Sequence, residues 1–405
     1  MRLQVPGARG VRTSLAGPSC AGLVLLSMAC VSGEAGPAWA GSVDTLPDGR
    51  ISIRSPEIGS WEQMGDAPWR LVEELRIGSI DAEGPDAFGS IAGLDVDARG
   101  RIYVLDRQAR ELRAFDDDGG HVRTMGGEGG GPGEFGDPIG VALDPMDRLL
   151  VVDVGNGRYS RFDTAGVYLG AVPRPVGGYS VPARVGFDLE GRFLEGALAQ
   201  SGDAYGQAIL RWDTAFARVD TFRIPDYPTD EFELVRGEMR MTADVPFAPT
   251  LVWALDVRGR YWTAITDRMR FVEHALEGDT LRVIERDSEP IPTRDEDRER
   301  AIRGLEWFTR QGGRVDPSRI PDERPQLAQV AVSPDGYLWV RATPVTPGVA
   351  NRFDIYDPGG RYLGAVATEL GFHPAPVVRG DRVYGVISDS LGVSYVVRAR
   401  IMSGG

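Results

Sequence analysis

The sequence predicts an all-β fold, a six-bladed β-propeller of four-stranded antiparallel blades, closed by an N-terminal strand and carrying a small helical insertion. Three observations predict it. Strand–turn–strand units recur along most of the chain, the last unit lacks its fourth strand, and a strand-like segment precedes the first unit. The composition suits many short strands and tight turns, because the 405 residues include 53 Gly and 28 Pro and are 42% hydrophobic.

Each repeated unit consists of an apolar strand, a tight turn containing Asp or Gly, and a second apolar strand. Gly and Asp suit the turn because they tolerate positive φ at low cost. The spacings between the turn residues are 47, 44, 68, 77 and 45 positions, and three of them match the length of a propeller blade. The two long spacings indicate insertions. The six turn residues are Gly100, Asp147, Gly191, Gly259, Gly336 and Asp381.

A later strand in each of the first five units ends in an aromatic residue or His, followed by another turn and strand, which gives four strands per unit. The sixth unit stops after its third strand, Val393–Ile401. We expect Trp69–Ile77 to supply the missing fourth strand, because an open ring would leave unpaired strand edges. The propeller then spans residues 69–405, and residues 41–68 form an N-terminal extension.

Residues 1–40 have the order of a signal peptide: a basic start, an apolar stretch too short to span a bilayer, and small residues around Ala40. The alternative is a lipoprotein signal ending at Cys30, which would make an outer-membrane lipoprotein. Cys20 and Cys30 both precede Ala40, so the mature chain would have no thiol. The segment favours a periplasmic or secreted protein.

The charge excludes some classes of partner. The net charge is −14 and all 45 basic residues are Arg, so the surface would repel nucleic acid and anionic lipid. No stretch after residue 40 is apolar for long enough to predict a transmembrane helix. We expect a monomer whose partner is a small molecule or a protein.

Residues 126–162 begin GGEGGGPGEFGDPIGVALD and continue to an Asn before the third strand. This segment resembles the NHL repeat, and a fainter copy lies at Gly84–Phe88. The resemblance extends over roughly residues 69–401 and implies a six-bladed propeller similar to exported bacterial propellers. Propellers of this type include binding proteins, peptide-processing lyases and lactonases, so the resemblance does not fix a function.

The two insertions cover about residues 225–250 and 288–325, and each joins the fourth strand of one blade to the first strand of the next. Such connections emerge on one face of a propeller, so we expect the insertions side by side at one mouth of the channel. The second predicts a helix with a capping box from Thr293 to Glu296 and an apolar stripe ending at Phe308. The turns of the opposite face look too short to form a concavity.

Arginines and one tryptophan in the insertions are the candidate ligand-binding residues. In an acidic protein a group of arginines favours an anionic or carbohydrate-like ligand. The alternative is that these arginines pair with nearby acids such as Asp295, Glu296 and Asp322. The candidates are Arg236, Arg240, Trp307, Arg310, Arg314 and Arg324.

The catalytic residues, if any, are unknown from the sequence. Some propellers of this type are lyases with three metal-binding His, but His121, His274 and His373 fall at unrelated places in the repeat, so no metal site is predicted. Related lactonases use Asn and acids, and Asn156 and Asn351 occupy turn positions. No cofactor is predicted, although a divalent cation such as calcium in the channel is left open. The leading hypothesis is a binding or scaffold propeller in the cell envelope. The alternative is a metal-dependent lyase or lactonase-type hydrolase using carboxylates at the channel mouth.

Overall fold

The computed structural model describes residues 39–81, 83–174, 184–201, 204–344 and 351–403. The expected signal peptide and both cysteines therefore lie outside the described residues, apart from Trp39 and Ala40. The described residues belong to one compact unit, Pro37–Gly405. No helix among them is both long and apolar enough to cross a membrane.

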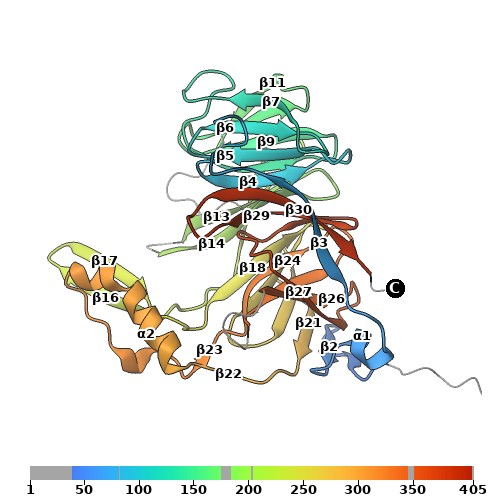
Figure 1. The fold of residues 1–405 in the computed structure, drawn as a ribbon, viewed down its shortest axis with the longest axis vertical. Coiled ribbons are helices and arrows are strands. Elements are labelled where there is room, and N and C mark those ends of the chain that lie inside the picture. The colour runs from blue at the N-terminus through green and yellow to red at the C-terminus, as the bar shows by residue number, and fades with distance from the viewer. Residues whose placement is uncertain (1–38, 82, 175–183, 202–203, 345–350, 404–405) are drawn as a thin grey trace, which may run out of the picture. The chain divides into compact units, whose positions relative to one another are not determined.

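The core of the fold is a series of six antiparallel sheets, the blades, each starting with its inner strand (Figure 1). The middle strands are continuous apolar runs because both of their faces are covered by neighbouring blades, whereas the outermost strands are largely exposed. The prediction of six blades, each built on the same four-stranded antiparallel unit, is therefore confirmed. Blades 1 to 3 consist of β4 (Ile91–Val96), β5 (Ile102–Asp106), β6 (Glu111–Phe115) and β7 (His121–Gly126); β8 (Pro138–Leu143), β9 (Arg148–Asp153), β10 (Arg158–Asp163) and β11 (Tyr168–Pro173); and β12 (Val185–Phe187), β13 (Phe193–Ser201), β14 (Ala204–Trp212) and β15 (Val219–Arg223).

Blades 4 and 5 follow the same pattern, and blade 6 is completed from the N-terminal side. Their strands are β18 (Leu251–Asp256), β19 (Arg260–Ile265), β20 (Arg270–Ala275) and β21 (Thr280–Arg286); β24 (Leu327–Val332), β25 (Leu338–Ala342), β26 (Asn351–Tyr356) and β27 (Tyr362–Thr368); and β28 (Val377–Arg379), β29 (Arg382–Ser388), β30 (Ser394–Met402) and β3 (Arg70–Ile77).

The ring is closed as predicted from the sequence. Strand β3 pairs antiparallel with β30, from Arg70 opposite Met402 to Ile77 opposite Val396. Ile77 is buried and shares an apolar cluster with strands of blades 1 and 6. The N-terminal strand therefore covers the edge that blade 6 would otherwise expose.

The N-terminal extension does more than lead into β3. Strands β1 (Ser42–Thr45) and β2 (Ile51–Ser55) form a hairpin, and β2 pairs in parallel with β21, so blade 4 has six strands instead of the expected four. The buried side chain of Ile53 explains the attachment, because it packs with Ile284 in the core between blades 4 and 5. Helix α1 (Ser60–Met64) then contacts blade 5, where Gly364 leaves room for the ring of Trp61.

Five of the six expected turn residues have positive φ, between 57° and 91°: Gly100, Asp147, Gly191, Gly259 and Gly336. The sixth, Asp381, lies in its turn as expected, but the residue with positive φ in that turn is Gly380. The reason is a tighter hairpin in blade 6: Arg379 pairs directly with Arg382, which leaves two residues for the turn, and the first takes the left-handed conformation.

The two insertions pack against each other, as expected, and we call them together the insertion module (residues 225–250 and 288–325; Figure 1). The first forms a hairpin and the second two helices, a 3-10 turn and a short pair of strands. Their apolar cluster is centred on Phe232 and Phe308, both essentially inaccessible to solvent. The elements are β16 (Glu231–Arg236) and β17 (Met239–Asp244), then β22 (Ile291–Pro292), α2 (Asp295–Gly304), α3 (Glu306–Arg310), η1 (Pro317–Arg319) and β23 (Glu323–Arg324).

The expected capping box from Thr293 to Glu296 is wrong by one position. Helix α2 begins after Arg294, whose backbone N–H donates to the carboxylate of Asp297 at 3.4 Å. Asp297 is buried, so it replaces Glu296 as the acid that caps the helix. The apolar stripe is confirmed, because Leu305 and Phe308 are buried in the module's core.

Candidate binding site

Trp307 lies on the outer side of the insertion module. Its side chain is 49% exposed although its neighbour Phe308 is buried, and the two rings meet edge-on at 5.7 Å between centroids. Arg310, on the same short helix, is exposed and pairs with Glu306. Neither residue belongs to the apolar core of the module, so the packing of that core does not require either side chain.

The predicted arginines divide into two groups. Arg240, Arg310 and Arg324 form ion pairs with Glu233, Glu306 and Asp297, so for these three the structure supports pairing with acids, although not with the acids named from the sequence. Arg236 and Arg314 are exposed and make no ion pair with an acid among the described residues.

The hairpin and the helices of the module meet at two points. The guanidinium of Arg236 lies against Gly312, where a Cβ atom would come within 2.3 Å of its terminal nitrogen. Arg319 bonds to Asp230 and to the carbonyl oxygen of Glu231, at 2.9 Å for the latter. These contacts place the tip of the hairpin beside the end of α3. Met239 (45% exposed) pairs with Arg236 across the hairpin and lies on the same face as Arg236, whereas Val235 (60% exposed) lies on the opposite face of the hairpin.

A hollow of about 230 Å³ lies on blade 4, near the place where the first insertion joins it. Its walls come from β19, β20 and the loop between them, and this loop is tied to the end of the insertion through Thr250 and Thr266. Successive strand residues face opposite sides, and Trp262 packs toward blade 5 while Tyr261 packs toward blade 3. The hollow therefore opens on the blade 3 side. Its lining residues are Thr263, Ala264, Ile265, Arg268, Arg270 and Val272.

Thr263 forms the polar part of this hollow away from solvent. Its hydroxyl lies 2.9 Å from Nε2 of His274, and the imidazole stacks on Tyr261 at 4.7 Å between ring centroids. Burial lowers the pKa of His274, so the imidazole is neutral near pH 7. The packing role expected for His274 is confirmed, and the bond to Thr263 is a feature that the sequence reading missed. The signal was present: a Thr on an otherwise apolar strand and a His where other units carry an aromatic ring.

The other candidate residues from the sequence do not gather. His121 is exposed on β7, where its Nε2 contacts Thr124, and His373 precedes blade 6. Asn156 donates to Asp153 and to the carbonyl oxygen of Gly129, so it holds the glycine-rich loop in place. Within the described ranges, no group of three His, Cys, Asp or Glu has the geometry of a metal site.

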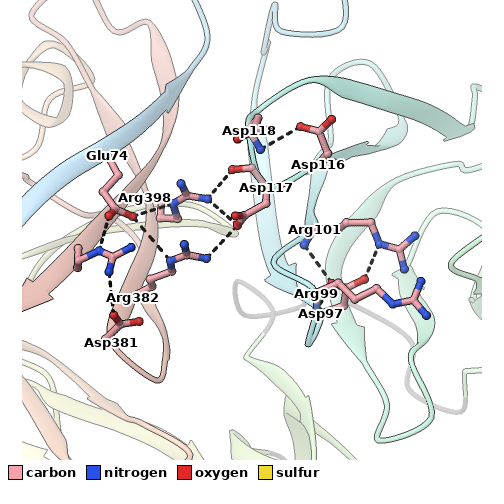
Figure 2. A network of polar contacts seen from close by, with 11 residues as sticks. Glu74, Asp97, Arg99, Arg101, Asp116, Asp117, Asp118, Asp381, Arg382 and Arg398 are labelled. Atoms are coloured by element: carbon pink, nitrogen blue, oxygen red, sulfur yellow. Dashed lines mark hydrogen bonds and ion pairs between the residues drawn. The ribbon is translucent and has the colours of Figure 1, made fainter.

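The opposite face carries a network of charged residues where blades 6 and 1 meet. We call it the closure seam: Glu74, Asp117, Asp381, Arg382, Arg398 and Arg400 (Figure 2). Glu74 on β3 accepts a hydrogen bond from Arg400 of β30 and forms an ion pair with Arg398 of the same strand. Asp117, in the turn between β6 and β7, accepts hydrogen bonds from Arg382 and Arg398. Figure 2 shows Arg382 and Arg398 lying between Glu74 and Asp117.

The closure seam shifts one pKa clearly. Burial alone would raise the pKa of Glu74, but the hydrogen bond from Arg400 and the charges of Arg398 and Arg382 lower it below the ordinary value of 4.5. Glu74 is therefore ionised at neutral pH, where it carries the charge that its three arginine partners face.

The expectation that this face has no concavity is wrong. An open pocket of about 410 Å³ lies beside the seam, between the turns of blades 1 and 6. It forms because the turn in blade 6 is short, while Asp97 holds the longer turn of blade 1 through the backbone N–H groups of Arg99 and Arg101. Arg379 lines this pocket and is itself paired with Asp95 on the innermost strand of blade 1.

Comparisons with known proteins agree with this architecture. A family model described as a 6-bladed beta-propeller matches residues 87–176. The human NHL-repeat-containing protein 4 is 32% identical over 121 residues, which are 30% of this chain and 85% of the relative. The class is thus a six-bladed β-propeller with one insertion module. Within that class, the chain belongs to the NHL-repeat family.

Solved structures with a similar fold have low sequence identity. A candidate exported protein from Bacteroides fragilis is 13% identical with a TM-score of 0.49, covering 87% of this chain and 99% of the other. A Bacteroides vulgatus protein is 10% identical with a TM-score of 0.48, covering 83% and 98%. Virginiamycin B lyase from Staphylococcus aureus is 9% identical with a TM-score of 0.39, covering 83% and 100%. At these identities the likeness concerns the fold alone.

Proposed function

We propose that the protein is an exported binding propeller of the cell envelope and that the insertion module is its binding surface. One observation carries the proposal. The module has its own apolar core, yet it leaves the large apolar side chains of Trp307, Val235 and Met239 exposed. Tryptophan is enriched where interfaces concentrate their binding energy, and an exposed apolar group that no core requires is typical of such surfaces.

The charge of the surface supports a partner with acidic or neutral groups. Arg236 and Arg314 are exposed in the same module, and they are available to a ligand because no described acid neutralises them. Export is the part of the proposal that rests on the order of residues 1–40, with cleavage after Ala40 favoured over lipidation at Cys30.

Photo-crosslinking in cells tests the surface. Trp307 is replaced by the photoreactive amino acid benzoylphenylalanine, and the matched control carries it at Leu189, which is 74% exposed in a turn of the opposite face. We expect one discrete adduct from position 307 after irradiation and none from position 189. Intact-mass analysis tells a protein adduct from a small molecule and gives the mature N-terminus. Equal labelling at both positions contradicts the proposal.

A further inference from the structure

The hollow on blade 4 is a second site, separate from the exposed surface of the insertion module, and its chemistry is more specific. Apolar side chains of Ile265 and Val272 form much of its wall. The polar groups are the hydroxyl of Thr263 and the guanidinium groups of Arg268 and Arg270. A small apolar cavity with a few convergent polar groups is the usual form of a small-molecule site.

Arg270 has hydrogen-bonding capacity to spare. Its Nε donates to Glu285 at 3.0 Å, and Glu285 is shared with Arg54, so one carboxylate serves two guanidinium groups. Its two terminal nitrogens have no partner among the residues that the structure describes. Arg268, by contrast, is held by Asp267 through two bonds of 2.9 and 2.7 Å, which first of all raise its pKa and keep it charged.

Thr263 also has a free interaction. A hydroxyl offers one donor and two acceptor sites, and the bond with His274 uses only one of them. When Nε2 of the neutral imidazole carries the proton, it donates to Thr263, and the hydroxyl can then donate into the hollow. A ligand that only accepts hydrogen bonds selects this tautomer.

We propose that the hollow binds a short-chain monocarboxylic acid, with its carboxylate between Arg270 and the hydroxyl of Thr263 and its hydrocarbon chain against Ile265 and Val272. The charge fits, because the free donors at the hollow all favour an acceptor that carries negative charge. The size fits as well, because about 230 Å³ is smaller than the roughly 300–1,000 Å³ of sites for drug-sized ligands.

Calorimetric titration with butyrate, hexanoate and octanoate tests the site, with hexanol as the ligand that lacks the charge. We expect saturable binding of at least one acid and none of hexanol. Arg270→Gln should weaken binding by about tenfold or more, as expected for a lost hydrogen bond to a charged group. The matched control is Arg260→Gln, because the Arg260 side chain is 42% exposed, against 43% for Arg270, and is likewise paired with a glutamate, but lies at the other end of β19. It should leave the affinity unchanged.

NMR locates the ligand and tests the role of Thr263. The methyl signals of Ile265 and Val272 should shift on titration, and the ¹⁵N shift of His274 Nε2 should move to the value of a protonated nitrogen. Thr263→Val keeps the shape of the side chain, so a roughly fivefold to tenfold loss of affinity with an unchanged melting temperature is expected. If this variant does not fold, Arg270→Gln still decides the matter.

Three results overturn the proposal: no saturable binding of any acid, binding that is the same in Arg270→Gln, or hexanol binding as well as hexanoate. A peptide terminus has the same carboxylate chemistry, so a tripeptide ending in Val is included. Tighter binding of the tripeptide than of hexanoate overturns the assignment to a free acid. None of these readouts depends on crosslinking at position 307, so this site and the proposed function can fail independently.

Discussion

The closure seam and the insertion module both join segments that are distant in sequence, but different forces hold them. The seam is a network of three carboxylates and three arginines, in which Glu74 pairs with all three arginines and Asp117 with two of them. The module is held mainly by an apolar cluster around Phe232 and Phe308. The seam lies where the ring of blades closes, whereas the module is an insertion between blades that the closure of the ring does not require. Damage to the first should therefore be global, and damage to the second should remain local.

The largest expected effect comes from deleting residues 41–78, which comprise the N-terminal extension and strand β3. This deletion takes away β3 and exposes the edge of β30, so we expect aggregation or loss of soluble protein. Solubility and thermal unfolding measure the result. As a control, replacing the hairpin of residues 231–244 by a short loop should leave a soluble, cooperatively unfolding protein. A deletion variant that is soluble and melts cooperatively would show that β3 is dispensable.

Phe308→Ala should have the next largest effect on stability. The side chain is fully buried, so the cavity should cost about 3–5 kcal/mol of the module's stability. We expect faster amide hydrogen exchange in β16, β17 and α3, with the melting of the propeller nearly unchanged. Phe271→Ala, in the core between blades 4 and 5, is the matched control and should lower the melting temperature of the whole protein. Equal global destabilisation by both would break the comparison.

Glu74→Gln tests the closure seam, the other half of this comparison. The carboxylate is partly buried among three arginines, so its loss should cost about 2 kcal/mol. Because the folded-state pKa of Glu74 is lowered, the stability that it contributes is full above pH 4.5 and is lost as the pH falls through the lowered value. Urea unfolding from pH 7 to pH 3 should show that the variant loses less stability with acid than the wild type. Identical slopes would mean that Glu74 does not act through its charge.

The smallest effect on stability is expected for Trp307→Ala combined with Arg310→Ala. Both side chains are exposed and neither belongs to the module's core, so the free energy of unfolding should change by no more than about 0.5 kcal/mol. The same variant should lose binding to whatever partner the crosslinking identifies. A large drop in melting temperature would instead make α3 a structural strap.

The ring could be predicted from the sequence because its signals are local and repeated. Each turn needs a residue such as Gly100 that tolerates positive φ, and each unit repeats the same order of strands. Closure by Trp69–Ile77 followed from counting strands. The pairing of β2 with β21 could not be predicted in this way, because Ile51–Ser55 is a short strand whose partner depends on which edge lies free nearby.

The candidate site was less accessible to sequence reasoning. The insertions were expected side by side because every connection of their kind emerges on one face, and the apolar cluster that they share shows that they pack together. The hollow on blade 4 depends on a contact between Thr263 and His274, which lie diagonally across two strands. A single sequence shows each residue but not which neighbour it meets. The free nitrogens of Arg270 were hidden for the same reason, since the sharing of Glu285 with Arg54 depends on the unpredicted hairpin.

The pairing of the first and last strands also sets a timetable for folding. Glu74 and Arg400 are 326 positions apart, so β3 leaves the ribosome long before the strand that it pairs with. At about 10 residues per second, the delay is roughly half a minute. Throughout that time β3 has no partner and the ring cannot close. The protein is therefore expected to need protection of this strand during synthesis, until the final blade arrives.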